Sequence, residues 1–328
     1  MSPFWRRRGP LESINPFVRI PPQIGLGLAA LGRPAYIDVG RDRDLGSDRS
    51  RAAMEARCHE VLDAAYAAGI RYFDAARSYG DAEAFLGRWL DSRRPDDVEV
   101  GSKWGYSYVG EWRMDAEVQE VKDLSAATLQ RQAAESGLLL GRMPVPYQIH
   151  SATLESGVFD DRAVIRALRS LREAGWEFGF TTSGPHQIDT IARGLELQVD
   201  GESLFGSVQS TWNLLEPSVA PALDDARMRG CVVIVKEVLA NGRLARPDGP
   251  LAGIATRLGV TPDRIAMAAA LGQHWADVVL SGAVTIEQIQ SNVAALDLQL
   301  NPDDLAELGA LAEPAERYWA ERAELPWS

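Results

Sequence analysis

The sequence predicts an α/β fold: a single (β/α)8 TIM barrel with a C-terminal helix and long loops over the C-terminal face. Short apolar, β-rich runs alternate with helical patterns at a spacing of roughly 30 residues, which is typical of βαβ units. Eight such runs occur in a chain of 328 residues. No linker and no shift in composition divides them, which favours one closed barrel over two open sheets.

The expected elements follow each other in strict alternation. Several helices begin with proline or an acidic residue and end at glycine. The expected strands are Ile24 to Leu28, Ile70 to Phe73, Val98 to Ser102, Pro146 to His150, Phe178 to Thr182, Phe205 to Gln209, Cys231 to Val235 and Val278 to Leu280. The expected helices are Ala52 to Ala68, Asp81 to Asp91, Glu120 to Leu140, Asp161 to Ala174, Pro185 to Leu195, Pro217 to Arg229, Pro262 to Trp275 and Ile286 to Leu296, with a final helix from Pro302 to Ala312 packed on the barrel.

The domain organisation expected from this pattern is an N-terminal extension, residues 1–22, followed by the barrel, residues 23–328. Two long segments break the alternation: Ile37 to Arg51, after the first strand, and Tyr106 to Asp115, after the third. In a barrel both would rise over the C-terminal face, where such loops build active sites.

Composition excludes several classes of protein. A net charge of -12 argues against a nucleic-acid partner, because such proteins need clustered Lys and Arg. The one basic run, Trp5 to Arg8, is followed by no apolar stretch of signal-peptide or membrane-spanning length, so we expect a cytoplasmic protein without a membrane partner. Cys58 and Cys231 are far apart and are expected as reduced, buried thiols. The histidines are scattered, and we expect no metal site.

Four ionisable residues are expected at the carboxyl ends of consecutive strands. Asp74 ends the second strand and Tyr79 follows in the turn, while Lys103 ends the third strand and His150 the fourth. Each could be structural when taken alone, but together they suit proton delivery to a carbonyl oxygen. Tyr79 would be the general acid, its pKa lowered by Lys103, which Asp74 would hold. His150 would orient the carbonyl, and an acid of this kind contributes about 10² to 10⁴-fold to the rate.

The motifs FDAARSYGDAEAFLG, GSKWG, YQIHS, VQSTWN and LSGAVTIEQIQSN, in this order, resemble the aldo-keto reductase superfamily from Gly25 to about Leu296. The catalytic tetrad of that superfamily falls on the same four residues, Asp74, Tyr79, Lys103 and His150. The resemblance implies a barrel that binds NAD or NADP without a Rossmann domain and interconverts carbonyl and alcohol by hydride transfer. The segments ARSYGDAEAFLGRWL and STWNLLEPS are similar to those of bacterial enzymes of the aldose and L-fucose or L-galactose dehydrogenase type.

The resemblance also implies cofactor contacts. At the nicotinamide end, the glycine turn corresponds to Gly27 and Leu28. Ser183 and Gln209 would bind the carboxamide, although Gly184 replaces the asparagine common after that serine. Lys236 stands where an aromatic residue commonly stacks on the nicotinamide, so either Trp212 supplies the ring, or the face is covered otherwise and Trp212 is core, which we favour. The pyrophosphate and adenosine would lie on Ser281, Gly282, Ala283, Gln288 and Asn292.

Cofactor choice and substrate are the remaining expectations. Gly282 and Gln288 stand where NADPH-specific members usually place Lys or Arg, so NAD should be accepted more readily than in a typical member, with NADP still open. Trp104 and Tyr106, in an aromatic-rich loop, are expected to contact the substrate, and Trp104 is the stronger candidate. Aromatic faces suit a sugar ring or a flat apolar carbonyl compound. The substrate would be an aldehyde, a ketone or a sugar lactol or lactone.

Other interpretations carry less weight. Gly25 to Ala30 fits the relaxed dinucleotide fingerprint G-x-G-x-x-A, but Gly32 and Pro34 prevent the helix that a Rossmann unit needs. A glycosidase would need a second carboxylate opposite Asp74, and none stands out. A cofactor-binding barrel with a regulatory or sensing role and little turnover is the alternative function, because Lys236 and the missing basic residue could misplace the nicotinamide. The sequence leaves the oligomeric state open.

Overall fold

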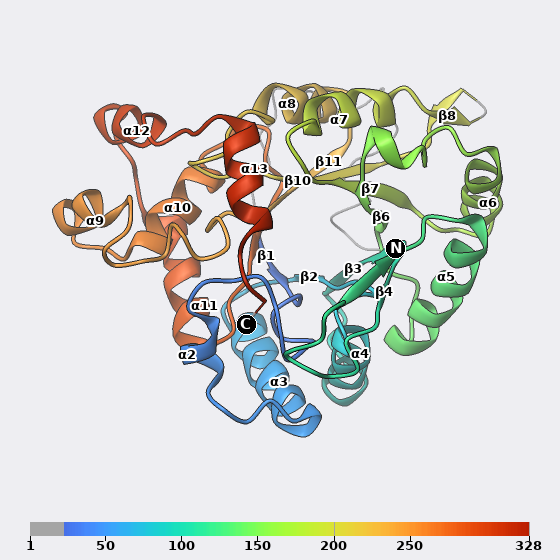
Figure 1. Cartoon of the computed structure of the whole chain (residues 1–328), viewed down its shortest axis with the longest axis horizontal. Coiled ribbons are helices and arrows are strands. Elements are labelled where there is room, and N and C mark those ends of the chain that lie inside the picture. Colours follow the sequence, from blue (N-terminus) through green and yellow to red (C-terminus); the bar gives the residue numbers. More distant parts are fainter. Residues whose placement is uncertain (1–22, 200, 328) are drawn as a thin grey trace.

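The computed structural model describes residues 23–199 and 201–327, so the expected N-terminal extension, residues 1–22, lies outside the described residues. Eight parallel strands close into a barrel, in the order β1-β12-β11-β10-β7-β6-β3-β2 (Figure 1). The predicted fold class is confirmed, and every predicted strand overlaps an observed one. The strands are β1 (Gln23–Gly27), β2 (Tyr72–Asp74), β3 (Glu99–Trp104), β6 (Tyr147–Ala152), β7 (Phe178–Thr182), β10 (Ser207–Thr211), β11 (Val232–Lys236) and β12 (Val278–Ser281).

Helices surround the barrel, and the predicted ones are present with ends shifted by a few residues (Figure 1). Side-chain caps fix several starts: the Ser50 hydroxyl accepts from the Ala53 amide, and the Asp161 carboxylate accepts from two amides of the first turn. These helices are α3 (Arg51–Ala67), α4 (Ala82–Arg93), α5 (Ala126–Leu140), α6 (Arg162–Glu173), α7 (Gln187–Leu195), α8 (Ala220–Met228), α10 (Pro262–Leu271), α11 (Ile286–Val293) and α12 (Pro302–Gly309).

The helix expected from Glu120 to Leu140 is wrong over its first six residues. Residues Glu120–Lys122 form β5, which pairs antiparallel with β4 (Tyr106–Tyr108). The helix α5 starts only after Ser125, whose hydroxyl accepts from the Thr128 amide. Residues that pair in a hairpin over the barrel do not show the helical period, and the cap marks where that period begins.

Several short elements were not expected from the sequence. Three are α-helices of five, seven and nine residues. The additional elements are α2 (Arg41–Leu45), α9 (Ala252–Leu258), α13 (Ala315–Ala323), the 3-10 turn η2 (Leu154–Ser156), and the strands β8 (Gln198–Val199) and β9 (Glu202–Ser203). The 3-10 turn η3 (Ala294–Asp297) takes the place of the last residues of the helix predicted from Ile286 to Leu296.

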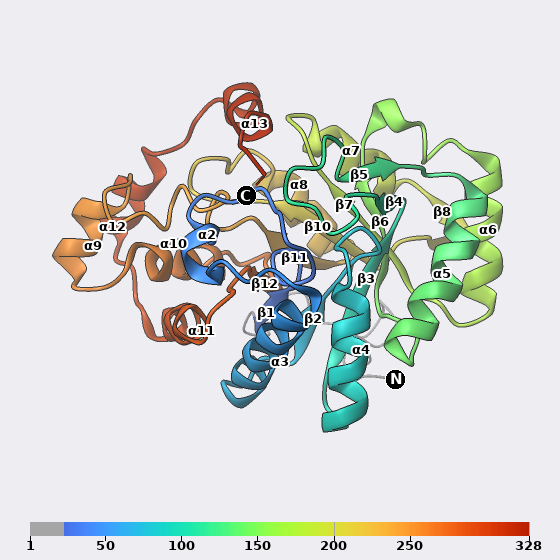
Figure 2. The same ribbon diagram turned by 60° about the horizontal axis from the view of Figure 1, so that its bottom comes forward.

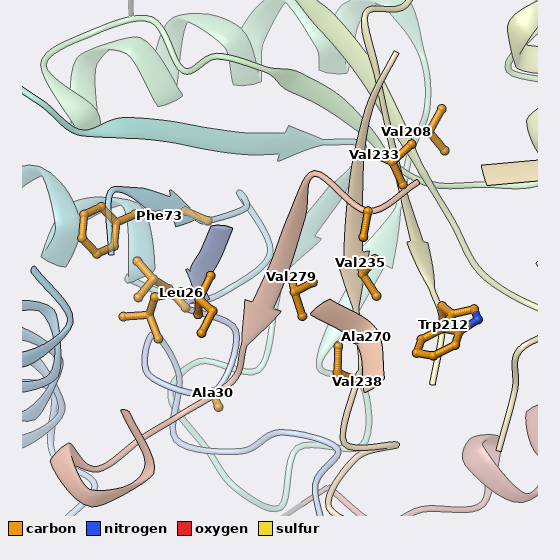
Figure 3. Packing of buried hydrophobic residues seen from close by; sticks show 14 of the residues in the cluster. Leu26, Ala30, Phe73, Val208, Trp212, Val233, Val235, Val238, Ala270 and Val279 are labelled. Atoms are coloured by element: carbon orange, nitrogen blue, oxygen red, sulfur yellow. The ribbon is translucent and has the colours of Figure 1, made fainter. Parts of the chain in front are cut away.

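The strands present alternate side chains to two separate cores. Tyr72, Val232, Ile234, Val278 and Leu280 form a cluster inside the barrel. The intervening residues, among them Phe73, Val233, Val235 and Val279, belong to the larger cluster shared with helix residues such as Ala270 (Figure 3). This alternation decides which residues at the strand ends face the barrel axis.

The inner core requires a glycine on β1. A Cβ on Gly25 would lie 2.8 Å from side-chain atoms of both Leu280 and Tyr72. The large inward side chains therefore fill the barrel at the level of Gly25. At the next inward position, Gly27, a Cβ would approach only the Ser281 carbonyl, at 3.6 Å, so the barrel has free space above this layer.

The C-terminal segment returns to the end of the barrel that carries the loops. In Figure 2 the helices α2 and α13 lie with the C-terminus at one end of the barrel. Ile37 and Trp327 form an antiparallel bridge between the first loop and the last described residues. Within the described part of the chain, no helix has the length and apolar character needed to cross a membrane.

Candidate active site

A cavity of about 500 Å³ opens at the carboxyl ends of the strands. Inward-facing strand ends form its floor: Gly27, Asp74, His150, Gln209 and Lys236 line it. Loops after the strands and the last turn of α13 form its walls. A barrel places its reactive groups at this end, because the loops there vary independently of the packed strands.

The four predicted catalytic residues are brought together at one side of the cavity. The Lys103 ammonium donates to the Asp74 carboxylate and, at 2.9 Å, to the carbonyl of Ala75. Both side chains of this ion pair are almost fully buried. Lys103 Nζ lies 4.9 Å from the centre of the Tyr79 ring, and the rings of Tyr79 and His150 are 5.5 Å apart in an edge-to-face arrangement. Tyr79 and His150 line the cavity, with the ion pair below them.

His150 is held as a neutral imidazole. Burial, and then the charges of Lys103 and Lys236, lower its pKa well below 6.5. The Ser78 hydroxyl lies 3.3 Å from His150 Nδ1. If that hydroxyl donates to Nδ1, the ring proton is on Nε2, and the imidazole can donate a hydrogen bond to a ligand oxygen.

The expectation that Lys103 lowers the pKa of Tyr79 is wrong in this structure. Burial raises the pKa of Tyr79 well above 10, the Asp74 charge adds to the rise, and Arg33 opposes it in part. The physical reason is that Asp74 neutralises Lys103, while the surrounding barrel end shields the phenol from much of the solvent. The phenol therefore stays protonated at neutral pH, which is the state that a proton donor needs.

Gln209 hydrogen-bonds to two other buried polar side chains of the strands. Its Nε2 donates to Asp74 Oδ1 at 3.0 Å and to Gln148 Oε1 at 3.2 Å. Gln209 thus fixes the carboxylate that holds Lys103, in addition to lining the cavity where a carboxamide contact is predicted.

The other end of the cavity is built around β12 and α11. Ser281 Oγ donates to Asn292 Oδ1 at 2.7 Å, and Asn292 Nδ2 donates to Asp263 Oδ2 at 2.8 Å. Gln288 accepts from the Val284 amide and donates to Asp44 Oδ2, each at 2.8 Å. The predicted cofactor residues that line this one cavity, at its two ends, are Gly27, Ser183, Gln209, Lys236, Ser281, Gly282, Ala283, Gln288 and Asn292.

Comparison with known proteins adds the decisive observation to this geometry. The sequence matches the Aldo/keto reductase family over residues 23–313, almost the entire described barrel. The chain belongs to the aldo/keto reductase family. The resemblance found in the sequence is thereby confirmed, and membership makes the protein an oxidoreductase.

Individual relatives of this aldo/keto reductase are distant. Aldo-keto reductase str7 of Strobilurus tenacellus is 24% identical over an alignment of 331 positions, gaps included, and the alignment covers 89% of this chain and 88% of that protein. The holo form of aldo-keto reductase AKR11C1 from Bacillus halodurans has a TM-score of 0.64 at 22% identity, covering 89% of this chain and 93% of the other. The glycerol dehydrogenase AKR11B4 from Gluconobacter oxydans has a TM-score of 0.67 at 19% identity, covering 88% and 90%.

A structure of aldo-keto reductase from Klebsiella pneumoniae in complex with NADPH is similarly related. Its TM-score is 0.64 at 21% identity, and the match covers 90% of this chain and 93% of the other. At these identities the structural likeness shows the barrel fold shared within the family.

Two predicted site residues of this aldo/keto reductase lie elsewhere. Trp104, expected to contact the substrate, is fully buried in the core outside the barrel, and Leu28, expected near the nicotinamide, lies in the same core. Strand alternation is the reason: Lys103 and Gly27 face inward, so the residues that follow them face outward. Trp212 belongs to this outer core too and packs edge-on against Trp275 at 5.8 Å, as the core interpretation predicts.

Tyr106, the other predicted substrate contact, lies at the cavity. It stands at the start of β4, and its ring is 5.0 Å from the ring of His150. Burial raises its pKa to about 12, so it is a neutral phenol at any physiological pH. Its role in substrate binding stays a prediction, at a position adjacent to the catalytic candidates.

Sequence reasoning missed an arginine at the centre of the cavity wall. Arg33 is 2% exposed, and its guanidinium stacks between the rings of Tyr36, Tyr79 and Trp327 at 4.8–5.3 Å. It also donates to Glu120 at 2.5 Å. Apart from Tyr36, three residues further on, these partners come from three distant parts of the chain, and no local pattern around Arg33 signals them.

A second missed group ties the C-terminal helix to the barrel. Glu237, directly after β11, accepts from Arg322 of α13 at 2.8 and 2.5 Å. Both residues line the cavity. Within residues 23–199 and 201–327, no cluster of His, Cys, Asp and Glu side chains fits a metal ion.

Proposed function

We propose that the protein is an NAD(P)-dependent oxidoreductase that interconverts a carbonyl group and an alcohol by hydride transfer, with Tyr79 as general acid and base. The carbonyl would be an aldehyde, a ketone or a sugar lactol or lactone. The observation that carries the proposal is the convergence of Tyr79 and His150 on one cavity above the buried Lys103–Asp74 pair. Membership of the family supports it independently.

The two ends of the cavity would have different roles, cofactor binding and proton transfer. A bound nicotinamide cofactor would supply or accept the hydride, and the polar groups on β12 and α11 fit its phosphate and adenosine portion. The start of α11, capped by Thr285, lies at this end of the cavity, and a helix start suits phosphate oxygens. The cofactor-binding roles of Ser183, Gln209 and Gln288 belong to this proposal.

Proton transfer would fall to the residues at the other end. During reduction, Tyr79 would deliver its proton to the carbonyl oxygen as the hydride reaches the carbonyl carbon. The neutral His150 would donate a hydrogen bond to the same oxygen and set its direction. Arg33, the cation that opposes the rise of the Tyr79 pKa, would stabilise the phenolate that remains, while the Lys103–Asp74 pair, with Nζ 4.9 Å from the Tyr79 ring, would hold the phenol in place.

A preference for NAD over NADP is the finer part of the proposal. The adenosine end is lined by the carboxylates of Asp44 and Asp263, and Gln288 is already held by Asp44. Arg41, the cation at this end, donates to the carbonyls of Ala30, Pro34 and Arg33. A 2'-phosphate would meet carboxylates there, whereas ribose hydroxyls can donate to them.

The test is turnover of a carbonyl panel with NADH and with NADPH, together with dissociation constants for both cofactors. Reduction of at least one aldehyde or ketone is expected, with kcat lowered by about 10² to 10⁴-fold in Tyr79→Phe. A dissociation constant more than tenfold lower for NADPH would contradict the NAD preference. Tight cofactor binding with no turnover across the panel would instead support the regulatory barrel, which the converged tetrad disfavours.

A further inference from the structure

Lysine is rare in this chain, and its distribution is uneven. Of 34 Lys and Arg residues only three are lysines: Lys103, Lys122 and Lys236. All three lie close enough to His150 to lower its pKa by their charge. A protein of net charge -12 therefore gathers its lysines around one end of one cavity.

Most charges at this end are paired one to one. Lys103 binds Asp74, Arg33 binds Glu120, and Arg322 binds Glu237 through two hydrogen bonds. Each pair joins one cation to one carboxylate. These three pairs contribute no net charge to the cavity.

Of the two remaining lysines, Lys122 does not line the cavity and donates to the Ser151 carbonyl, and Lys236 is the one that lines the cavity. Its Nζ donates to the neutral hydroxyl of Thr211 at 2.8 Å, and it lies 3.5 Å from Glu237 Oε1. That carboxylate already accepts on both oxygens from Arg322. Two cations thus share one carboxylate, and the side chains of these three pairs together with Lys236 carry one surplus positive charge.

The ammonium is directed to the barrel axis. Val232 and Ile234 of the same strand belong to the inner cluster, so Lys236, two residues further, faces inward as well. Its side chain is 16% exposed and lines the cavity with Tyr79 and His150. A largely buried cation costs free energy unless an anion compensates it.

Burial lowers the pKa of Lys236 below 10.5, and Glu237 offsets only part of that change. The pKa of Glu237 is about 2, because Arg322 and Lys236 outweigh the upward effect of its burial. The carboxylate is thus fully charged at neutral pH and already serves both cations.

We infer that the carbonyl substrate carries an anionic group, in the simplest case a carboxylate, and that Lys236 binds this group. The inference rests on the proposed function and names its substrate class. The substrate carboxylate would form an ion pair with Lys236, which has only the neutral Thr211 hydroxyl and a share of Glu237 as partners. The carbonyl group would then lie between Tyr79 and His150. The pyrophosphate of the cofactor offers the same anionic chemistry, and the test separates the two sources.

The kinetic arm compares succinate semialdehyde with butanal, which differ by a carboxylate in place of a methyl group. Wild-type protein should prefer the anion in kcat/KM, and Lys236→Met should reduce that preference by about tenfold to a hundredfold, mainly through KM. Lys236→Arg should retain most of it. Lys122→Met is the matched control: it removes a lysine that donates to the Ser151 carbonyl, and it should leave the preference unchanged.

The binding arm does not depend on turnover. With 15Nζ-labelled lysine the chain offers three side-chain signals, and the one missing in Lys236→Met is that of Lys236. Succinate, which has no reducible carbonyl, should shift this signal with and without NAD bound, while butane-1,4-diol should not.

The outcomes are distinct. An unshifted Lys236 signal on addition of succinate would overturn the inference. A loss of kcat/KM in Lys236→Met that is equal for both aldehydes would overturn it as well. If Lys236→Met weakens NAD binding by the same factor as it lowers kcat/KM, the anion is the pyrophosphate of the cofactor. If succinate shifts the signal but no carbonyl compound is turned over, the anion site stands and the proposed function fails.

Discussion

Glu237 and Arg322, 85 positions apart in the sequence, form a two-point ion pair at the edge of the cavity. Glu237 leaves the barrel directly after β11, and Arg322 lies in the last turn of α13. Both side chains are largely buried. The C-terminal helix is therefore attached to the barrel at the same point where it contributes a wall of the cavity.

Arg322→Met should loosen this attachment and destabilise the fold. It leaves the buried Glu237 with Lys236 alone, and breaking a buried pair in this way costs about 3 kcal/mol. Because the pKa of Glu237 is lowered to about 2 from 4.5, the pair stabilises the fold above pH 4.5, and this contribution is lost as the pH falls toward 2. Urea unfolding at pH 7 measures the loss. Arg317→Met, which breaks an exposed pair on the same helix, is the control and should cost less than about 1 kcal/mol.

Tyr79→Phe should lower kcat by about 10² to 10⁴-fold, because the proton donor is removed while the ring stays in place. The melting temperature should change little. Tyr66→Phe, which removes a phenol hydroxyl bonded to Asp97 on the surface, is the matched control. Steady-state kinetics decide the question, and a Tyr79→Phe enzyme with near wild-type kcat would exclude the phenol as the acid.

Variants of the Lys103–Asp74 pair should distinguish its contribution to stability from its contribution to activity. Asp74→Asn leaves a buried ammonium with reduced compensation and should cost about 3 to 5 kcal/mol of unfolding free energy. Adding Lys103→Met removes that charge, so the double variant should recover part of the stability. It should not recover activity, since the cation beside Tyr79 is then absent. Recovery of both in the double variant would show that the pair is only structural.

His150 should remain neutral down to acidic pH. Its folded pKa lies below 6.5, so the unfolded state binds more protons between the two values, and stability from this group is lost as the pH falls below 6.5. The chain has four histidines, which makes its NMR titration simple to assign. Lys236→Met should raise the pKa of His150 by removing a nearby cation. A wild-type imidazole that titrates near 6.5 would contradict this arrangement.

Asp44→Asn should improve NADP binding relative to NAD. The substitution removes a negative charge next to Gln288 and keeps an oxygen that can accept its hydrogen bond. We expect the ratio of dissociation constants to move toward NADP by about 1.5-fold to fivefold, the range for one exposed charge. Asp42→Asn, two residues earlier and paired with Arg49, is the control. An unchanged ratio would remove Asp44 from cofactor selection.

Local sequence pattern was sufficient for the barrel and the catalytic candidates. Periodicity identified the strands, and polar residues at the ends of consecutive apolar strands, as with Asp74 and Lys103, indicate a site when they occur together. The outward placement of Trp104 and Leu28 also follows from sequence once Lys103 and Gly27 are taken to face inward, because strand side chains alternate.

The cavity walls depend on contacts between distant segments. Helix α13 has few apolar residues, and only Tyr318 and Trp319 are buried, so its sequence resembles that of an exposed tail until Glu237 binds Arg322. Arg33 likewise pairs with Glu120, 87 positions away.

The sequence by itself determined the fold class, the family and the four residues at the strand ends, because these depend on repeating local patterns and on strand geometry. Only the tertiary structure decided which charges neutralise one another, and hence that Lys236 is left with a shared carboxylate and that burial raises the pKa of Tyr79. Charge pairing and desolvation depend on which surfaces of the loops, α13 and the barrel contact each other in the folded protein. No repeating pattern in the sequence indicates these contacts.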